Sequence, residues 1–193
     1  SSIVAILREL YWEIHCYQPH TTKAGFQMIG GALVADMKVM RTMLLHKWDE
    51  VEHRQWAWEC YLALGGDPHR GTREPMSPGA FAVCAVWERL GTHLSALSYV
   101  GAEYLLEALT ARLSPLVVDR LHSRDIKPEG MRFIADHAVE DQKHKNLFEH
   151  LIVEIGDAHP GLHAEILYCY DCFNAVYPMP LWEACAARAE AMP

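Results

Sequence analysis

No stretch of this 193-residue sequence reaches the roughly 18 consecutive uncharged, apolar residues of a membrane-spanning helix, so we expect no membrane contact. Basic residues are also few, since 17 Lys and Arg against 25 Asp and Glu give a net charge of −8 with His neutral. Such a surface repels phosphate, which argues against a nucleic-acid partner. Arg8, Glu9 and Glu13 interrupt the first apolar run, which excludes the apolar core of a secretory signal. We therefore expect a cytoplasmic protein.

Cysteine is sparse and unpatterned, with six residues scattered along the chain. Their positions in apolar, helical stretches are typical of reduced core thiols in a cytosolic protein. Cys169 and Cys172 have the spacing of a redox-active pair, but they lack the strand and turn that usually precede one. A redox-active pair is therefore the weaker alternative.

Alternation of apolar and polar residues, the mark of a β-strand, is missing, and apolar residues recur instead at helical spacing. The length suits one domain, so we predict a single all-α domain over residues 1–193, a bundle of about seven helices. Its first helix should carry a buried stripe from Ile3 to Tyr17 and end at Pro19. The other expected segments are residues 21–64 as two helices or one bent near Gly30 and Gly31, a loop at 65–78, a long helix at 78–113, a short helix from Ser114, a helix from 125–129 to 155, a helix at 160–177 and a short final helix.

Histidine is abundant, with twelve residues, and one spacing of histidine and acid occurs twice. The two copies are His46, Glu50 and His53, and His137, Asp141 and His144. Every residue of the second copy lies 91 positions after its counterpart in the first. At this composition the pattern is expected by chance only about 0.09 times, so two copies in register need a physical explanation.

Residues at positions i, i+4 and i+7 lie on one face of a helix, so each copy presents imidazole, carboxylate and imidazole along one stripe. Helical bundles build carboxylate-bridged di-iron sites from such stripes on facing helices. Imidazole with carboxylate suits Fe(II) or Mn(II), and the absence of thiolate argues against structural zinc. The alternative is a solvated helix face, but surface charge has no reason to keep a register.

Further carboxylates should complete the site. Glu103 and Glu107 lie one turn apart in an otherwise apolar segment, where an acid is costly unless it meets a cation or water. We favour Glu107 as a ligand and place Glu103 behind it, and Glu13 beside the first apolar stripe is a weaker candidate. The predicted ligands are therefore His46, Glu50, His53, Glu107, His137, Asp141 and His144, with Glu13 and Glu103 as further candidates.

The segments HKWDEVEHRQWAWECYLALGGD, YLLEAL and HAVEDQKHKNLFEHL resemble the heme-oxygenase-like di-iron oxidase and oxygenase superfamily, whose members are often named iron-containing redox enzymes. The resemblance covers about residues 10–155 and implies a heme-oxygenase-like helical bundle. It places the second triplet of the family on His137, Asp141 and His144.

The same resemblance places the first acid and histidine of the family on Glu50 and His53, and its central-helix glutamate on Glu107. Some members have a glutamate where this chain has His46. The first-helix glutamate of other members has no counterpart in register, since Glu13 lies about a turn away.

The patterns and the resemblance together favour an O₂-activating enzyme with two iron ions, or manganese in one site, and O₂ as co-substrate. We expect a small organic substrate from natural-product, fatty-acid or amino-acid metabolism, and a homodimer as one candidate assembly. One rival is a haem-binding oxygenase of the same fold, which explains one histidine but not two triplets. Another is a non-catalytic, ferritin-like iron-binding protein. Candidates for an apolar substrate lining, although their spacing is also typical of plain core, are Met28, Met37, Met40, Met43, Trp48 and Trp56.

Overall fold

The computed structural model describes residues 2–31, 36–72, 74–93, 95–124 and 126–191, and within these ranges the chain is helical without a β-strand. The predicted all-α class is therefore confirmed. Among the described residues, no helix is long and apolar enough to cross a membrane. The α-helices are α1 (Ile3–Gly31), α2 (Met37–Asp49), α3 (His53–Ala63), α4 (Pro78–His93), α5 (Val100–His122), α6 (Arg132–Ala158), α7 (His163–Asn174) and α8 (Met179–Ala191).

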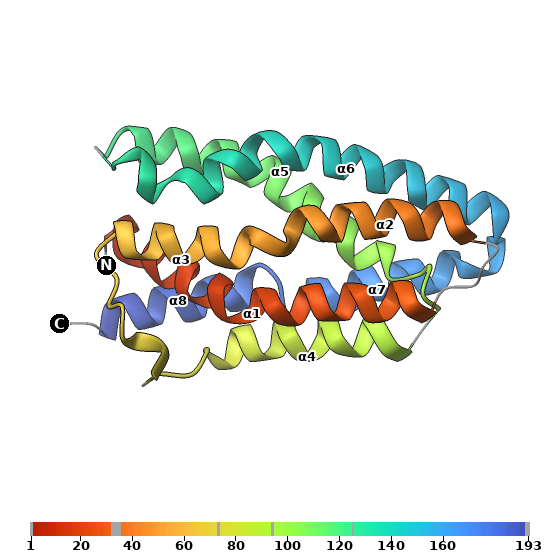
Figure 1. Ribbon diagram of the computed structural model, residues 1–193, viewed down its shortest axis with the longest axis horizontal. Helices are drawn as coiled ribbons and strands as arrows, with labels where there is room; N and C mark the ends of the chain where they lie inside the picture. Colours follow the sequence, from red (N-terminus) through yellow and green to blue (C-terminus); the bar gives the residue numbers. More distant parts are fainter. Residues whose placement is uncertain (1, 32–35, 73, 94, 125, 192–193) are drawn as a thin grey trace.

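Two groups of helices face each other across the bundle. Helix α1 packs against α2, α3, α4 and α8, whereas α5 packs along α6 and α7. Helices α2 and α3 follow one another in a single row, which lies between α1 and the pair α5 and α6 (Figure 1). The space between this row and the α5–α6 pair is where the two predicted stripes can meet.

The core between these helices is rich in aromatic residues. Trp12, Trp87, Tyr61, Phe148 and Phe173 are almost completely buried. Burying one such side chain contributes about 1.5–3 kcal/mol, so the core can hold polar groups in its interior.

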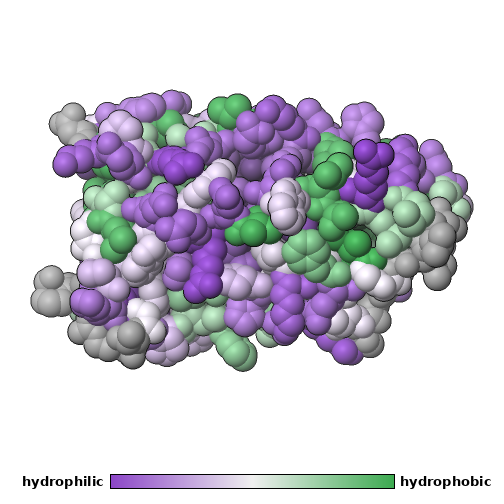
Figure 2. Space-filling view, in the orientation of Figure 1, coloured by the Kyte–Doolittle hydropathy of each residue, from purple (hydrophilic) through white to green (hydrophobic). Residues whose placement is uncertain are grey.

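The outer face of α2 is apolar. Met37, Leu44, Leu45 and Trp48 are all exposed there, Trp48 to 70%. Figure 2 shows hydrophobic side chains gathered on the side of the molecule where α2 lies. An exposed apolar face of this kind is a candidate surface for the expected homodimer. The homodimer itself stays a prediction.

Two proline positions differ from the expectation. Helix α1 runs through Pro19 to Gly31 instead of ending before the proline. A proline inside a helix costs about 3 kcal/mol. Packing of α1 against four other helices outweighs that cost.

The expected short helix from Ser114 is part of α5, which continues through Pro115. Proline has no N–H to donate to the carbonyl four residues earlier, which is that of Ala111. Gln142 on α6 supplies the missing donor, with its Nε2 2.5 Å from the Ala111 oxygen. A side chain from a neighbouring helix therefore replaces the missing backbone donor.

The expected long helix at 78–113 is also wrong, because α4 ends at His93 and α5 begins at Val100. Side chains satisfy the backbone of the connection. The Ser98 hydroxyl donates to the Ser95 carbonyl at 2.7 Å, and the Glu165 carboxylate on α7 accepts from the Ser95 amide at 3.3 Å. These polar contacts replace the helical hydrogen bonds that a continuous helix would have formed.

Candidate metal centre

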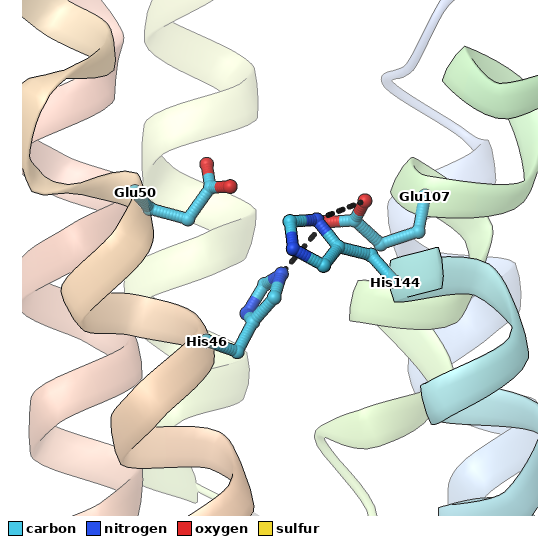
Figure 3. Close-up of side chains that lie close together, drawn as sticks. All are labelled: His46, Glu50, Glu107 and His144. Carbon is cyan, nitrogen blue, oxygen red and sulfur yellow. Dashed lines mark hydrogen bonds and ion pairs between the residues drawn. The ribbon is translucent and has the colours of Figure 1, made fainter. Parts of the chain in front are cut away.

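The α2–α3 row carries the first stripe. The chain tightens into one 3₁₀ turn at Glu50–Glu52, but the Glu50 amide still bonds the His46 carbonyl, so the helical path continues. His46, Glu50 and His53 are all buried. Figure 3 shows His46 and Glu50 pointing toward Glu107 and His144, and the ring of His53 lies 4.5 Å from that of His137 on α6, measured between centroids. The structure therefore places these three residues in the interior, and their role as ligands stays a prediction.

The second stripe lies on α6, beside Glu107 of α5. Asp141 is 1% exposed, and His137 and His144 lie partly buried one turn to either side of it. Glu107 is buried on α5, which packs along α6. The four residues therefore reach the same interior space as the first stripe.

One group of four ligands is drawn in Figure 3. His46, Glu50, Glu107 and His144 each offer a donor atom, and these atoms all lie within 4.8 Å of one another. The nitrogen Nε2 of His46 is 2.9 Å from Oε1 of Glu107, and Nδ1 of His144 is 3.4 Å from Oε2 of Glu107. Helix α2 with the 3₁₀ turn that follows it, α5 and α6 thus supply one compact set of imidazoles and carboxylates.

The remaining predicted ligands adjoin this group. Nδ1 of His53 is 2.8 Å from Oε2 of Glu50, and the rings of His53 and His137 have centroids 4.5 Å apart. Asp141 lies 3.8 Å from His144. The seven main candidates therefore lie in one cluster in the interior. In it Glu107 contacts His46 and His144, and Glu50 contacts His53.

The carboxylates between the histidines are held in their charged form. Burial alone would raise the pKa of Glu107, but hydrogen bonds with His144 and His46 lower that pKa to about 2. Burial opposes the charge of Glu50 too. The hydrogen bond that His53 donates to it, together with the nearby imidazole of His46, nevertheless brings the pKa of Glu50 well below its usual value. These two carboxylates are therefore negatively charged at physiological pH.

Asp141 and His144 hold protons instead. Burial, followed by the repulsion of Glu107, raises the pKa of Asp141 to about 8. Burial would lower the pKa of His144, but its interaction with Glu107 raises it to about 9. The metal-free cluster thus limits its negative charge by retaining protons.

Metal binding should therefore release protons. Asp141, with a pKa of about 8, and His144, with a pKa of about 9, are protonated at neutral pH, whereas a metal ion binds the deprotonated forms. We expect close to two protons per chain on filling the centre at neutral pH, and tighter binding as the pH rises through these pKa values. Anaerobic calorimetric titration with Fe(II) in buffers of different ionisation enthalpy measures the number of protons released per chain. A value of zero would show that neither group is a ligand.

The cluster fits a metal ion in two further ways. Nδ1 of His46 and Oδ2 of Asp141 are buried without a hydrogen-bond partner among the described residues. Such atoms cost about 1–3 kcal/mol each unless something binds them. Imidazole nitrogen and carboxylate oxygen without thiolate suit iron or manganese.

The two further candidates lie elsewhere. Both oxygens of Glu13 accept from the Ser77 amide at 3.1 and 3.0 Å, and Arg188 lies 2.8 Å from one of them. Glu13 therefore caps the start of α4 instead of joining the centre. Glu103 lies one turn from Glu107, where Lys47 forms an ion pair with it at 2.7 Å. Its place behind the ligands is as expected.

Lys47 and Gln18 are buried polar residues beside the cluster that the sequence pattern did not indicate. Lys47 follows His46 directly and is 2% exposed. Its alkyl chain passes over Gly25, where a Cβ would lie 2.7 Å from Cδ of the lysine. Gln18 donates from Nε2 to Oε2 of Glu50 at 3.3 Å. Both residue types are usually exposed, so their burial follows from tertiary packing that no local pattern encodes.

An apolar cavity of about 250 Å³ ends at the cluster. Glu50, His53, Glu107, His137 and Asp141 line its inner end, and aliphatic side chains of α1 and α5 line most of the rest. The methionine and tryptophan lining expected from the sequence is wrong. Met28 and Met43 are core residues, Met37 and Trp48 are exposed on α2, and none of the six expected residues lines the cavity.

The cysteines are all free, as expected for reduced thiols. Burial raises the pKa of Cys169 to about 11, so this residue is a thiol at neutral pH and not a reactive thiolate. The redox alternative for the pair with Cys172 therefore has no support from the structure.

Comparison with known families supports the metal centre. The family model described as iron-containing redox enzyme matches residues 21–176, which include α2, α3, α5 and α6. The chain belongs to this family. The family description therefore supports an iron-dependent redox function in general terms. No match was found among curated proteins.

A solved structure shows the same fold. It is the crystal structure of a domain of unknown function with a heme oxygenase-like fold from Shewanella denitrificans OS217. The TM-score is 0.74 at 18% sequence identity, and the match covers 97% of this chain and 77% of that one. This member of the iron-containing redox enzyme family therefore has a heme oxygenase-like fold, as the resemblance implied.

Proposed function

We propose that this chain holds two iron ions between the α2–α3 row and the α5–α6 pair and uses O₂ to oxidise a small, largely apolar organic molecule. One observation carries the proposal: two stripes of histidine and acid, far apart in sequence, face each other at the inner end of an apolar cavity. Manganese in one of the two positions is compatible with the same donors.

The ligands divide naturally between two positions. His46, Glu107 and His144 surround one, and His53, His137 and Asp141 adjoin the other, with Glu50 close to both histidines of its own stripe. Iron, when bound, supplies the activation of O₂, which organic side chains do not provide.

The chain itself fixes the ligands and excludes water. Nδ1 of His137 donates a hydrogen bond to the Phe133 carbonyl at 2.6 Å. This bond orients the ring and leaves its Nε2 available to a metal ion. Gln18 fixes one oxygen of Glu50 in the same way. The aliphatic cavity walls keep the substrate next to the centre in a dry environment, where side reactions with water are suppressed.

Iron loading tests this proposal. Protein loaded anaerobically with Fe(II) should bind about two irons per chain. On mixing with O₂ it should consume O₂ faster when an apolar compound fills the cavity than when the cavity holds only buffer. Uptake of many irons without faster O₂ consumption would favour a ferritin-like carrier. Tight binding of hemin with a Soret band, and no stoichiometric Fe(II) binding, would favour a haem oxygenase.

A further inference from the structure

The cavity that ends at the metal centre is long and narrow. Helix α1 lines it from Tyr17 to Ile3, and α5 lines it from Glu107 to Leu121. Each of these spans covers fifteen residues, or fourteen steps along the helix axis, so each helix gives the cavity a length of about 21 Å. A volume of about 250 Å³ distributed over that length suits a thin chain better than a compact ring system.

The two ends of the cavity differ in chemistry. The inner end has the metal ligands, and the outer end has aliphatic side chains from the start of α1 and the end of α5. Ile3 lines the outer end and is 36% exposed, so this end of the cavity lies at the protein surface. An apolar chain could therefore enter at the N-terminal end of α1 and reach the centre lengthwise.

Two tyrosines give the inner end a polar surface. Tyr17 and Tyr177 are more than nine-tenths buried, and both line the cavity. Glu50 lies near the Tyr17 hydroxyl, and Asp141 and Glu107 lie near that of Tyr177. These two hydroxyls lie beside the proposed ligands and can donate a hydrogen bond to, or accept one from, a polar group of the bound molecule.

The charge of the lining limits what that polar group can be. No Lys or Arg lines the described cavity, whereas Glu50, Glu107 and Asp141 do. A carboxylate head group would therefore find no cation of the chain itself to pair with, and an uncharged head group would meet only hydrogen-bonding partners.

We propose that the substrate is an unbranched aliphatic molecule with one small, uncharged polar head, bound lengthwise with the head at Tyr17 and Tyr177 and the tail toward Ile3. This inference rests on the proposed function for the statement that the head end reacts. The shape and polarity of the cavity carry the rest, and they depend on the chain alone.

Straight-chain primary alcohols from hexanol to dodecanol test the inference by anaerobic calorimetry, with and without added Fe(II). Affinity should rise about three- to fourfold per added methylene in both preparations. Cyclododecanol should bind at least about tenfold more weakly than dodecanol, and without iron dodecanoate should bind more weakly than dodecanol. The proposal would be overturned if the affinity did not change along the alcohol series, or if cyclododecanol bound as tightly as dodecanol. It would also be overturned if dodecanoate bound as tightly as dodecanol in the absence of iron.

Val117→Phe provides a test with a matched control. Val117 lines the cavity on α5, ten residues and about 15 Å beyond Glu107, so a larger side chain there should shorten it. This variant should bind hexanol like the parent and dodecanol at least about tenfold more weakly. Leu116→Phe adds a ring at the neighbouring position, which is 58% exposed and outside the cavity, and should leave the whole series unchanged. Equal behaviour of the two variants would contradict the assigned path of the tail.

Tyr177→Phe tests the head. It should weaken dodecanol binding about three- to tenfold through the loss of one hydrogen bond. An unchanged affinity in this variant and in Tyr17→Phe would overturn the proposed orientation of the substrate.

Because no alcohol measurement requires iron, failure of the alcohol series refutes the substrate class alone. Failure to bind iron refutes the proposed function and leaves the series intact.

Discussion

His144→Ala is expected to lose tight binding of at least one iron ion while retaining its helices. His144 lies within reach of both Glu107 and Asp141, so its removal takes a nitrogen donor from the middle of the cluster. Loss of groups that merely orient a ligand costs tenfold to hundredfold in metal affinity, so loss of a ligand should cost at least about a hundredfold. Anaerobic Fe(II) titration measures the affinity, and far-ultraviolet circular dichroism measures the helices.

The same helix provides the control. His150 is exposed on α6, and its Nδ1 contacts only the Asn146 carbonyl of its own helix. His150→Ala should bind iron like the parent chain. His53→Ala, on the opposite stripe, should behave like His144→Ala. If both stripe variants kept the full iron stoichiometry and affinity, the assigned ligands would be wrong.

Lys47→Met should destabilise the protein strongly. The ammonium group of Lys47 is buried against Glu103 at 2.7 Å, beside the ring of Trp87. Removing the cation leaves Glu103 as an unpaired buried charge, which costs about 3–5 kcal/mol of unfolding free energy. Urea unfolding followed by circular dichroism measures the loss. The double variant Lys47→Met with Glu103→Gln should recover a large part of it, because no charge then remains unpaired.

Lys38→Met is the matched control for this effect. Lys38 lies on the same helix and pairs with Glu154 at 2.8 Å, but its side chain is 76% exposed. Exposed ion pairs contribute at most about 1 kcal/mol, so this variant should unfold at nearly the urea concentration of the parent. A loss for Lys47→Met no larger than that for Lys38→Met would show that the buried pair does not stabilise the bundle.

The ion pair also bears on the metal centre. Lys47 follows the ligand His46, and Glu103 lies one turn from the ligand Glu107. Helices α2 and α5 are therefore joined twice, by Lys47 with Glu103 and by His46 with Glu107. The first connection does not involve a ligand atom, so it can hold the two helices at a fixed separation before metal binds.

The residues that form the cluster could be predicted from the sequence because their spacing is a property of one helix. Residues at i, i+4 and i+7 share a face in any helix, so His46, Glu50 and His53 had to point the same way once α2 and α3 continued each other. The choice of Glu107 followed from an acid in an apolar segment. Glu13 looked similar, but its partners, Ser77 and Arg188, come from distant segments whose approach no local pattern reveals.

The helix boundaries show the same limit. Pro19 and Pro115 are local signals for a helix end, and both were overridden by tertiary contacts. The decisive contact for Pro115 comes from Gln142, which lies 31 residues after Ala111. Similarly, aliphatic residues that line the cavity have the same spacing as residues of a filled core. The sequence alone could not distinguish them, because the difference lies in how the neighbouring helices are placed.

The location of bound iron tests the central claim most directly. Crystals of the chain loaded anaerobically with Fe(II) can be measured at the iron absorption edge, where anomalous scattering locates each ion. We expect two peaks about 3.5–4 Å apart, within coordination distance of side chains from both stripes. A single peak, or peaks outside the space between the α2–α3 row and the α5–α6 pair, would contradict a shared two-iron centre.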